Sequence, residues 1–217
     1  MFWNFFKRDS VSPPANLKKS IENIQRQLCG VTKEEAFLLL GETKAGKTTL
    51  AYHFSNKELI SVDNNGELCI RLKDETKMIP DMVISSQKRS ETKIPHAITT
   101  KSGLVVWDCP GFLDTGNEDV YQDIINAVSI KTLFKKIKRI KFILLVPQKD
   151  LKGVAGDFLR SVKSFCELFE KIGNLEYVAK SIGLVITQCR KQLKKINILK
   201  EIKKSQKKIK DLMRKPR

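Results

Sequence analysis

The stretch LLLGETKAGKTTLAYHF, residues 38–54, constrains the fold of this chain more than any other feature. A run of leucines ends at Gly41, and after four intervening residues come Gly46, Lys47 and Thr48. This spacing is typical of a loop that cradles phosphate groups, provided that the loop follows a strand and opens a helix. Both conditions are met, because the preceding residues are continuously apolar and the following ones predict a helix. The stretch therefore predicts a strand, a phosphate-binding loop and a helix in succession.

The rest of the chain alternates between apolar, strand-like runs and helix-like patterns of apolar residues. Such alternation is typical of an α/β fold, in which helices connect the strands of a parallel sheet. We predict the three-layer α/β fold of P-loop nucleoside triphosphatases (NTPases), with a mainly parallel sheet, helices on both faces and one antiparallel edge strand. The predicted strands are 36–40, 67–72, 104–108, 140–146 and 182–187, and the predicted helices are 16–29, 47–56, 120–134 and 155–171.

Two further segments complete this prediction. Residues 67–72 alternate between apolar and polar side chains, which predicts a half-buried strand at an edge. Residues 85–103 are polar and weakly patterned, which indicates a loop.

Length and composition suit one such domain with short appendages. The chain has 217 residues. We expect an N-terminal extension and helix over 1–30, the P-loop domain over 31–190 and a basic helix or tail over 191–217. Five scattered cysteines without CxxC spacing indicate reduced thiols and a cytoplasmic protein. His53 and His96 are the only histidines and lie far apart in the sequence, which argues against a metal held by histidine.

Positive charge is concentrated at the C-terminal end. The net charge is +17, and residues 190–217 contain 13 Lys/Arg against 2 Asp/Glu. This segment is either a solvated helix face, or a binding surface for an acidic membrane or an acidic protein partner, or a nucleic-acid contact. It contains no aromatic residue, which disfavours nucleic acid because bases stack on aromatic side chains. The aromatic-rich residues 1–6 either pack on the domain or lie at a membrane interface, which would make the protein peripheral to a membrane.

The residue types of the loop fit the binding of a nucleotide. Glycines let the backbone turn tightly and aim several N–H groups at phosphate oxygens, and the helix that follows adds the positive end of its dipole. Lys47 would supply a positive charge to the β- and γ-phosphates, and the Thr48 hydroxyl would ligate Mg²⁺. The alternative is a surface Gly-Lys turn that begins a helix. We predict nucleotide contacts from the whole loop: Gly41, Glu42, Thr43, Lys44, Ala45, Gly46, Lys47, Thr48 and Thr49.

A second motif follows the strand predicted at 104–108. This strand ends in Asp108, and Gly111 stands three residues later. An aspartate at this strand end would reach Mg²⁺, and the Gly111 N–H could approach the γ-phosphate because no side chain blocks it. The alternative is an ordinary Asp-Cys-Pro-Gly turn. The loop upstream favours the functional interpretation.

Together, the two motifs resemble the GTPase domain (G domain) of translation-factor-class GTPases. The resemblance is closest to the branch that contains the immunity-associated GTPases, the septins and the chloroplast import-receptor GTPases. It implies an Mg²⁺-dependent protein that binds GTP and GDP and acts as a slow GTPase switch. It covers about residues 36–187 and is carried, besides the loop, by Ser90, Thr92, Asp108, Cys109, Pro110, Gly111, Asp114 and Thr115.

The resemblance also implies a set of metal-site residues: Thr48, Thr92 and Asp108. Thr92 would be the threonine that senses Mg²⁺ and the γ-phosphate. Thr99 and Thr100 are rivals for this role, because one sequence does not fix the register of the loop. A solvated loop hydroxyl is the alternative for each of the three threonines.

The chain departs from this resemblance where the base would be read. GTPases of this kind read guanine with [N/T]KxD after a strand. Thr187 fits, but Gln188 replaces the lysine and Arg190 replaces the aspartate. Arginine only donates hydrogen bonds, so it cannot accept the guanine protons. We still predict Thr187 and Gln188 at the nucleotide, with Glu167 or Glu176 as alternative carboxylates, and guanine versus adenine stays open.

A second departure concerns hydrolysis. Phe112 stands where some GTPases place a glutamine that orients the attacking water. An apolar side chain cannot do so, and we expect slow hydrolysis. The missing group would come from a second copy in a homodimer across the nucleotide face, or from an arginine finger. Arg71, Arg89 and Arg160 are candidate arginines that also fit surface charges. Two alternatives to a GTPase switch remain: a P-loop ATPase or kinase-like enzyme, and a catalytically weak pseudo-GTPase scaffold.

Overall fold

The fold is seen in a computed structural model. It describes residues 15–28, 33–64, 67–79, 82–84, 92, 94–111, 120–152 and 180–189. The aromatic-rich N-terminal residues, the predicted helix over 155–171 and the basic C-terminal segment therefore lie outside the described residues.

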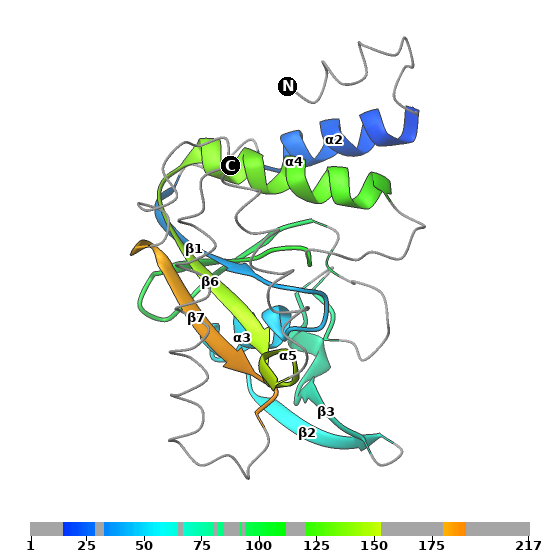
Figure 1. The fold of residues 1–217 in the computed structure, drawn as a ribbon, viewed down its shortest axis with the longest axis vertical. Coiled ribbons are helices and arrows are strands. Elements are labelled where there is room, and N and C mark those ends of the chain that lie inside the picture. Colours follow the sequence, from blue (N-terminus) through cyan, green and yellow to red (C-terminus); the bar gives the residue numbers. More distant parts are fainter. Residues whose placement is uncertain are drawn as a thin grey trace.

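Five described strands form one sheet (Figure 1). They are β1 (Lys33–Leu40), β4 (His96–Thr99), β5 (Val105–Asp108), β6 (Ile137–Pro147) and β7 (Ile182–Thr187), in the spatial order β4-β5-β1-β6-β7. The strands β5, β1, β6 and β7 run parallel, and β4 pairs antiparallel with β5 at one edge. The prediction of an α/β fold with a mainly parallel sheet and one antiparallel edge strand is confirmed.

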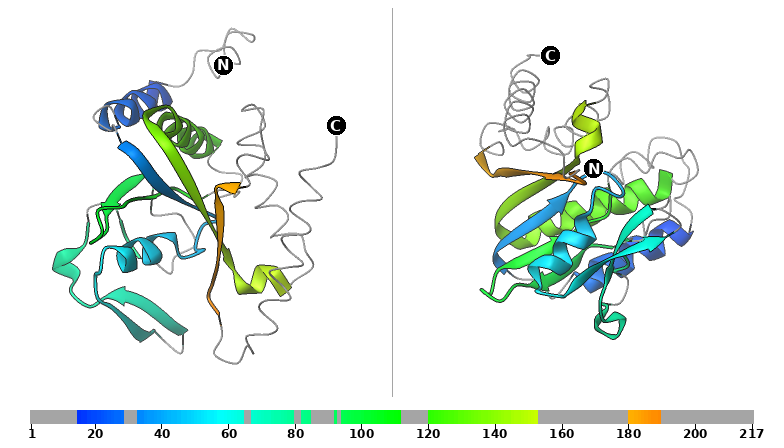
Figure 2. Two further views of the ribbon diagram at one scale, coloured as in Figure 1. Left: turned by 90° about the vertical axis from the view of Figure 1, so that its left-hand side faces the viewer. Right: turned by 90° about the horizontal axis from the view of Figure 1, so that it is seen from below.

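Helices cover both faces of this sheet (Figure 2). α2 (Ala15–Gln27) and α4 (Val120–Lys136) pack against each other on one face, and α3 (Lys47–Phe54) lies on the other. The short α5 (Gln148–Lys152) continues directly from β6. The helices predicted over 16–29, 47–56 and 120–134 thus correspond to α2, α3 and α4.

The residues of β1 divide between two hydrophobic cores. Leu38 and Leu40 pack with Leu133 of α4 on one face, and Leu39 packs with Tyr52 of α3 on the other. Successive side chains of a strand point to opposite faces, so a strand buried on both sides needs apolar residues at every position. This requirement explains the unbroken leucine run that precedes the loop.

The position predicted for the edge strand is wrong. Residues 67–72 do form a strand, β3 (Glu67–Leu72), but it pairs antiparallel with β2 (Leu59–Asn64) in a separate two-stranded hairpin. The antiparallel edge strand of the main sheet is β4, which lies inside the segment predicted to be a loop. β4 has only four residues, too few for the alternation of apolar and polar residues to stand out.

β6 begins three residues earlier than predicted, at Ile137. The charged residues near its start do not interrupt the strand, because their exposed side chains pair with carboxylates of neighbouring β1. Lys138 lies 2.6 Å from Glu34, and Lys141 lies 3.0 Å from Glu35. Among the residues that the structure describes, no helix is long and apolar enough to cross a membrane.

The two-sided burial of β1 leads to a stability prediction. Leu38→Ala, which removes a fully buried side chain, should lower the free energy of unfolding by about 2–5 kcal/mol. Leu104→Ala is the matched control, because Leu104 is 44% exposed, and should change it by no more than about 0.5 kcal/mol. Urea denaturation followed by circular dichroism measures both. Equal effects of the two substitutions would contradict the packing described here.

Candidate functional site

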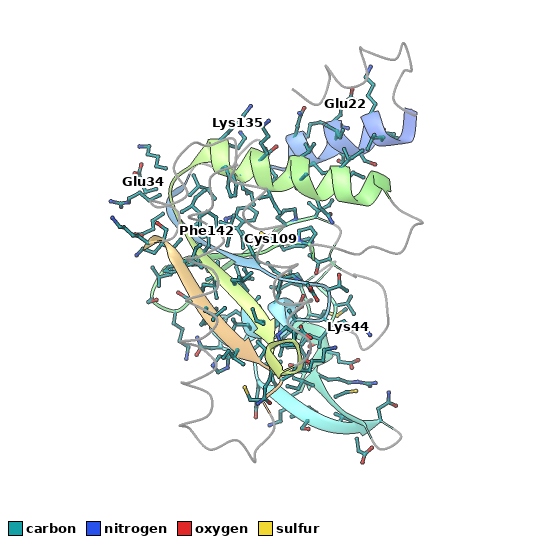
Figure 3. All side chains as sticks on the ribbon, in the orientation of Figure 1. Glu22, Glu34, Lys44, Cys109, Lys135 and Phe142 are labelled. Carbon is teal, nitrogen blue, oxygen red and sulfur yellow. The ribbon has the colours of Figure 1, made fainter. Side chains whose placement is uncertain are left out.

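The strand order of the sheet marks one edge as the expected place for a ligand. The carboxyl ends of β1, β5, β6 and β7 share this edge, because these strands are parallel. After β1 the chain continues to β4 and β5 on one side, whereas after β6 it continues to β7 on the other. At such a reversal of strand order the connections separate, and ligands of α/β proteins usually bind there. Lys44, in the loop after β1, lies at this edge in Figure 3, at the opposite end of the sheet from Glu34.

The loop of residues 41–48 packs directly on the sheet. At Gly41 φ is +149°, and a Cβ there would lie 2.5 Å from the carbonyl oxygen of Leu145 on β6. At Gly46 φ is +90°, and the next residue begins α3. Both positions favour glycine, since other residues rarely adopt such backbone angles. The N–H groups of the first turn of α3 have no intrahelical partner, and together with the helix dipole they attract anions.

The ammonium group of Lys47 is buried inside this loop. The residue is 6% exposed, and its Nζ donates hydrogen bonds to the carbonyl oxygens of Gly41 at 3.0 Å and Glu42 at 2.7 Å. A buried charge is unfavourable unless it is paired. Here the carbonyl oxygens accept from the ammonium group, and its charge also acts on Asp108.

Three oxygen-bearing side chains meet beside the loop. The Thr48 hydroxyl donates to Asp108 Oδ2 at 2.7 Å. The Thr92 hydroxyl lies 3.4 Å from the same carboxylate oxygen and 3.4 Å from the Thr48 hydroxyl. Thr48 begins α3, Asp108 ends β5, and Thr92 lies before β4. The structure therefore brings together all three residues that the sequence predicted for a metal site.

Asp108 is fully buried and only partly satisfied. Its Oδ1 has no hydrogen-bond partner among the described residues. Burial raises the pKa of the Asp108 carboxyl, and this rise is opposed by the Lys47 charge, the Thr48 hydrogen bond, His96 and Thr92. An added cation beside the Asp108 carboxyl group would favour its ionised form. Oxygen donors are the ligands that Mg²⁺ prefers, so the available residues fit this ion.

The described residues alone do not form a complete metal cage. Within the described ranges, no group of three or more His, Cys, Asp or Glu residues is placed to hold a metal ion. A metal that is bound by one or two protein groups and completed by substrate phosphates and water is the usual arrangement for Mg²⁺. Thr48 and Asp108 match that requirement, and Thr92 lies beside them.

Gly111 closes one side of the loop. A Cβ at Gly111 would clash with Thr43, whose backbone nitrogen would lie only 2.8 Å away. The buried amide of Asn126, on α4, donates to the Gly111 carbonyl oxygen at 3.3 Å. The Thr43 hydroxyl is itself buried without a hydrogen-bond partner among the described residues. The two predicted motifs are thus in contact, and only glycine fits at position 111.

The end of β7 holds the loop from the other side. The Thr187 hydroxyl donates to the carbonyl oxygen of Ala45 at 2.7 Å, and Gln188 Nε2 donates to the carbonyl oxygen of Lys44 at 2.7 Å. Gln188 has a φ of +53°, and Lys44 has a φ of +65°, both unusual for residues other than glycine. Both residues predicted at the base-reading position therefore contact the loop.

Other predicted residues lie elsewhere. Thr99 is exposed and pairs with Val105, at the end of β4 farthest from Asp108, and Thr100 bonds within the following turn to Ser102 and Leu104. Neither rival of Thr92 therefore reaches the site. Arg71 is exposed on the β2–β3 hairpin. Lying outside the described residues are Ser90, Phe112, Asp114, Thr115, Arg89, Arg160, Glu167, Glu176 and Arg190.

The sequence did not single out two residues of the site. Asn126 is buried on α4 together with one other polar residue, Ser129, and a polar residue within the buried face of this helix was the available signal. His96 lies across from Asp108 in the pairing of β4 with β5, a neighbour that only the strand register reveals. Cys109 faces the α2–α4 core and is fully buried (Figure 3), and burial raises the pKa of its thiol.

Comparisons with known proteins do not assign this chain to a family. No protein family, no curated protein and no solved structure matches the chain.

The contact between β7 and the loop can be tested without a ligand. Thr187→Val should lower the free energy of unfolding by about 1–3 kcal/mol, because it leaves the buried Ala45 carbonyl oxygen without its donor. Thr99→Val is the control, since Thr99 is an exposed strand residue. Both values come from urea denaturation. If Thr187→Val proves as neutral as Thr99→Val, then β7 does not hold the loop in the way described.

Proposed function

We propose that this chain is an Mg²⁺-dependent GTP-binding protein of P-loop NTPase fold that hydrolyses GTP slowly and acts as a molecular switch. One observation carries the proposal: a buried lysine, a helix N-terminus and a partly unsatisfied aspartate converge on the loop of residues 41–48. This combination provides for both the negative charge of a triphosphate and its accompanying cation.

Each part of the loop would have a definite role. Backbone N–H groups of the loop and of the first turn of α3 would bind phosphate oxygens. Lys47 would exchange the carbonyl oxygens of Gly41 and Glu42 for phosphate oxygens, which carry more negative charge. Thr48 and Asp108 would hold Mg²⁺, which neutralises charge on the phosphates. The contact of Gly111 with Thr43 brings a second backbone segment next to the same loop.

A switch needs segments whose position depends on the γ-phosphate. Thr92 and Gly111 are two such points, because each contacts the site and each adjoins a segment that carries a predicted switch motif. Phe112 offers no hydrogen bond to an attacking water, which is the reason to propose slow hydrolysis. A homodimer across the nucleotide face would supply the missing group, and the basic segment 190–217 would bind an acidic membrane surface or acidic protein partner at the cytoplasmic side.

Two other functions have support from particular residues. A P-loop ATPase or kinase-like enzyme is favoured by Arg190, which replaces the aspartate of the base-reading motif and cannot accept guanine protons. A pseudo-GTPase scaffold, which binds nucleotide without turning it over, is favoured by Phe112. GTP remains our proposal because of the two motifs that resemble GTPases.

Binding of labelled GTP and ATP, with and without Mg²⁺, tests the proposal. We expect Mg²⁺-dependent binding of GTP that exceeds binding of ATP. Lys47→Ala should weaken it about 10-fold to 100-fold, because it removes charge-assisted hydrogen bonds of roughly 1.5–3 kcal/mol. Lys101→Ala is the matched control: Lys101 is an exposed lysine in the turn between β4 and β5, outside the predicted nucleotide site. For the parent and for each variant, fluorescence anisotropy measures the binding of GTP and of ATP, each with and without Mg²⁺.

Each outcome of this titration has a defined meaning. Tighter binding of ATP would replace the GTPase proposal by the ATPase or kinase-like one. Binding of GTP without single-turnover hydrolysis would support the scaffold. Absence of binding of either nucleotide below millimolar concentration, or equal effects of Lys47→Ala and Lys101→Ala, would overturn the proposal as a whole.

A further inference from the structure

His96 lies next to the candidate metal site. It is the first residue of the edge strand β4, and in the antiparallel pairing with β5 it stands directly opposite Asp108. Directly paired residues of neighbouring strands place their side chains on the same face, with Cβ atoms about 4.5–5.5 Å apart. The imidazole of His96 and the carboxylate of Asp108 therefore share the face that α3 covers.

One polar atom of each residue in this pair lacks a partner within the described part of the chain. Four buried side-chain atoms there have no hydrogen-bond partner: Thr43 Oγ1, His96 Nε2, Trp107 Nε1 and Asp108 Oδ1. All but the Trp107 atom belong to residues at the loop edge of the sheet. Buried polar atoms are nearly always satisfied by protein or by ordered water. The unsatisfied atoms of His96 and Asp108 belong to directly paired residues, and this pairing points to a water molecule or ligand that both contact.

We propose that His96 is a positioning residue of the candidate site: its imidazole Nε2 and Asp108 Oδ1 bind one shared water molecule. That water holds the Asp108 carboxylate in the orientation in which Oδ2 receives the Thr48 hydroxyl. Either tautomer of a neutral imidazole suits this role, because a water molecule can both donate and accept a hydrogen bond. Residues that orient a metal-binding carboxylate in this way affect metal affinity without contacting the metal.

Direct ligation of Mg²⁺ by His96 is less compatible with the chemistry. Mg²⁺ prefers oxygen ligands, whereas imidazole suits softer transition metals. A purely structural role for His96 is the other possibility, since the residue is half-buried on the face that packs with α3. The two roles predict different results when Asp108 is replaced: the NMR signal of the His96 imidazole should change only if His96 is a positioning residue.

The chain permits a test of this response before any nucleotide is added. It contains only two histidines, so His53→Gln leaves His96 as the single imidazole. In nitrogen-15 NMR spectra at one fixed, mildly alkaline pH, Asp108→Asn should shift the His96 Nε2 signal and change the ratio of its tautomers. Asp63→Asn is the matched control, because Asp63 is an exposed carboxylate on the hairpin. An identical His96 signal in the Asp108→Asn variant and in its parent would overturn the proposal.

The second arm measures metal affinity and rests on the proposed function. His96→Leu should raise the Mg²⁺ concentration that half-saturates Mg²⁺-supported GTP binding about 10-fold to 100-fold. His96→Gln should raise this Mg²⁺ concentration less, because the glutamine amide can still bind the water. GTP binding without Mg²⁺, and the urea midpoint of His96→Gln, should stay close to those of the parent. Thr99→Val, an exposed substitution on the same strand, should leave the Mg²⁺ requirement unchanged.

The two arms separate failure of this inference from failure of the proposed function. If the parent binds no nucleotide, the proposed function fails, and the NMR response to Asp108→Asn still decides the role of His96. If the parent binds Mg²⁺ and GTP but His96→Leu needs no more Mg²⁺ than the parent, His96 has only a structural role and the inference is overturned.

Discussion

The parallel pairing of β1 with β5 and β6 is the constraint on which the candidate site depends. It brings the end of β1, with its glycine-lysine loop, next to Asp108 at the end of β5 and next to Leu145 of β6. The same pairing requires residues 36–40 of β1 to be apolar, because helices cover both faces of this part of the sheet. Fold and site therefore have a common origin: the register that buries the leucines also places Thr48 2.7 Å from Asp108.

The edge of the sheet that carries the loop of residues 41–48 contains several features that lower local stability. Lys47 and Asp108 are charged groups buried where a protein that only had to fold would place apolar ones, and Lys44 and Gln188 adopt backbone angles that favour glycine. The rest of the described chain offsets this cost with two continuous hydrophobic cores. Unsatisfied polar atoms and strained backbone gathered at one edge are typical of a site that is completed by a ligand, and this concentration supports the proposal more than any single contact does.

Most of the fold follows from short-range patterns in the sequence. The leucine run, the helix that begins at Lys47 and the strand that ends at Asp108 each have a local signature, so the α/β class and the neighbourhood of Thr48 and Asp108 could be predicted. The position of β4 could not, because four residues carry too little pattern, and β3 could not be assigned to its partner, because pairing is a long-range property. His96 was missed for the same reason: its importance arises from the register opposite Asp108, which no local pattern reveals. The contacts of Thr187 and Gln188 with the loop span more than 140 residues of sequence.

Hydrogen exchange of the backbone amides, measured by mass spectrometry with and without saturating Mg²⁺ and GTP, tests most directly whether this loop receives a triphosphate. If it does, exchange should slow in peptides that cover residues 43–48 and 108–111, and it should stay unchanged in the hairpin of β2 and β3. The N–H groups of the first turn of α3 should be among those most affected, because they have no intrahelical partner in the free protein. Unchanged exchange in the loop at saturating ligand, or protection confined to other parts of the chain, would contradict the proposed site.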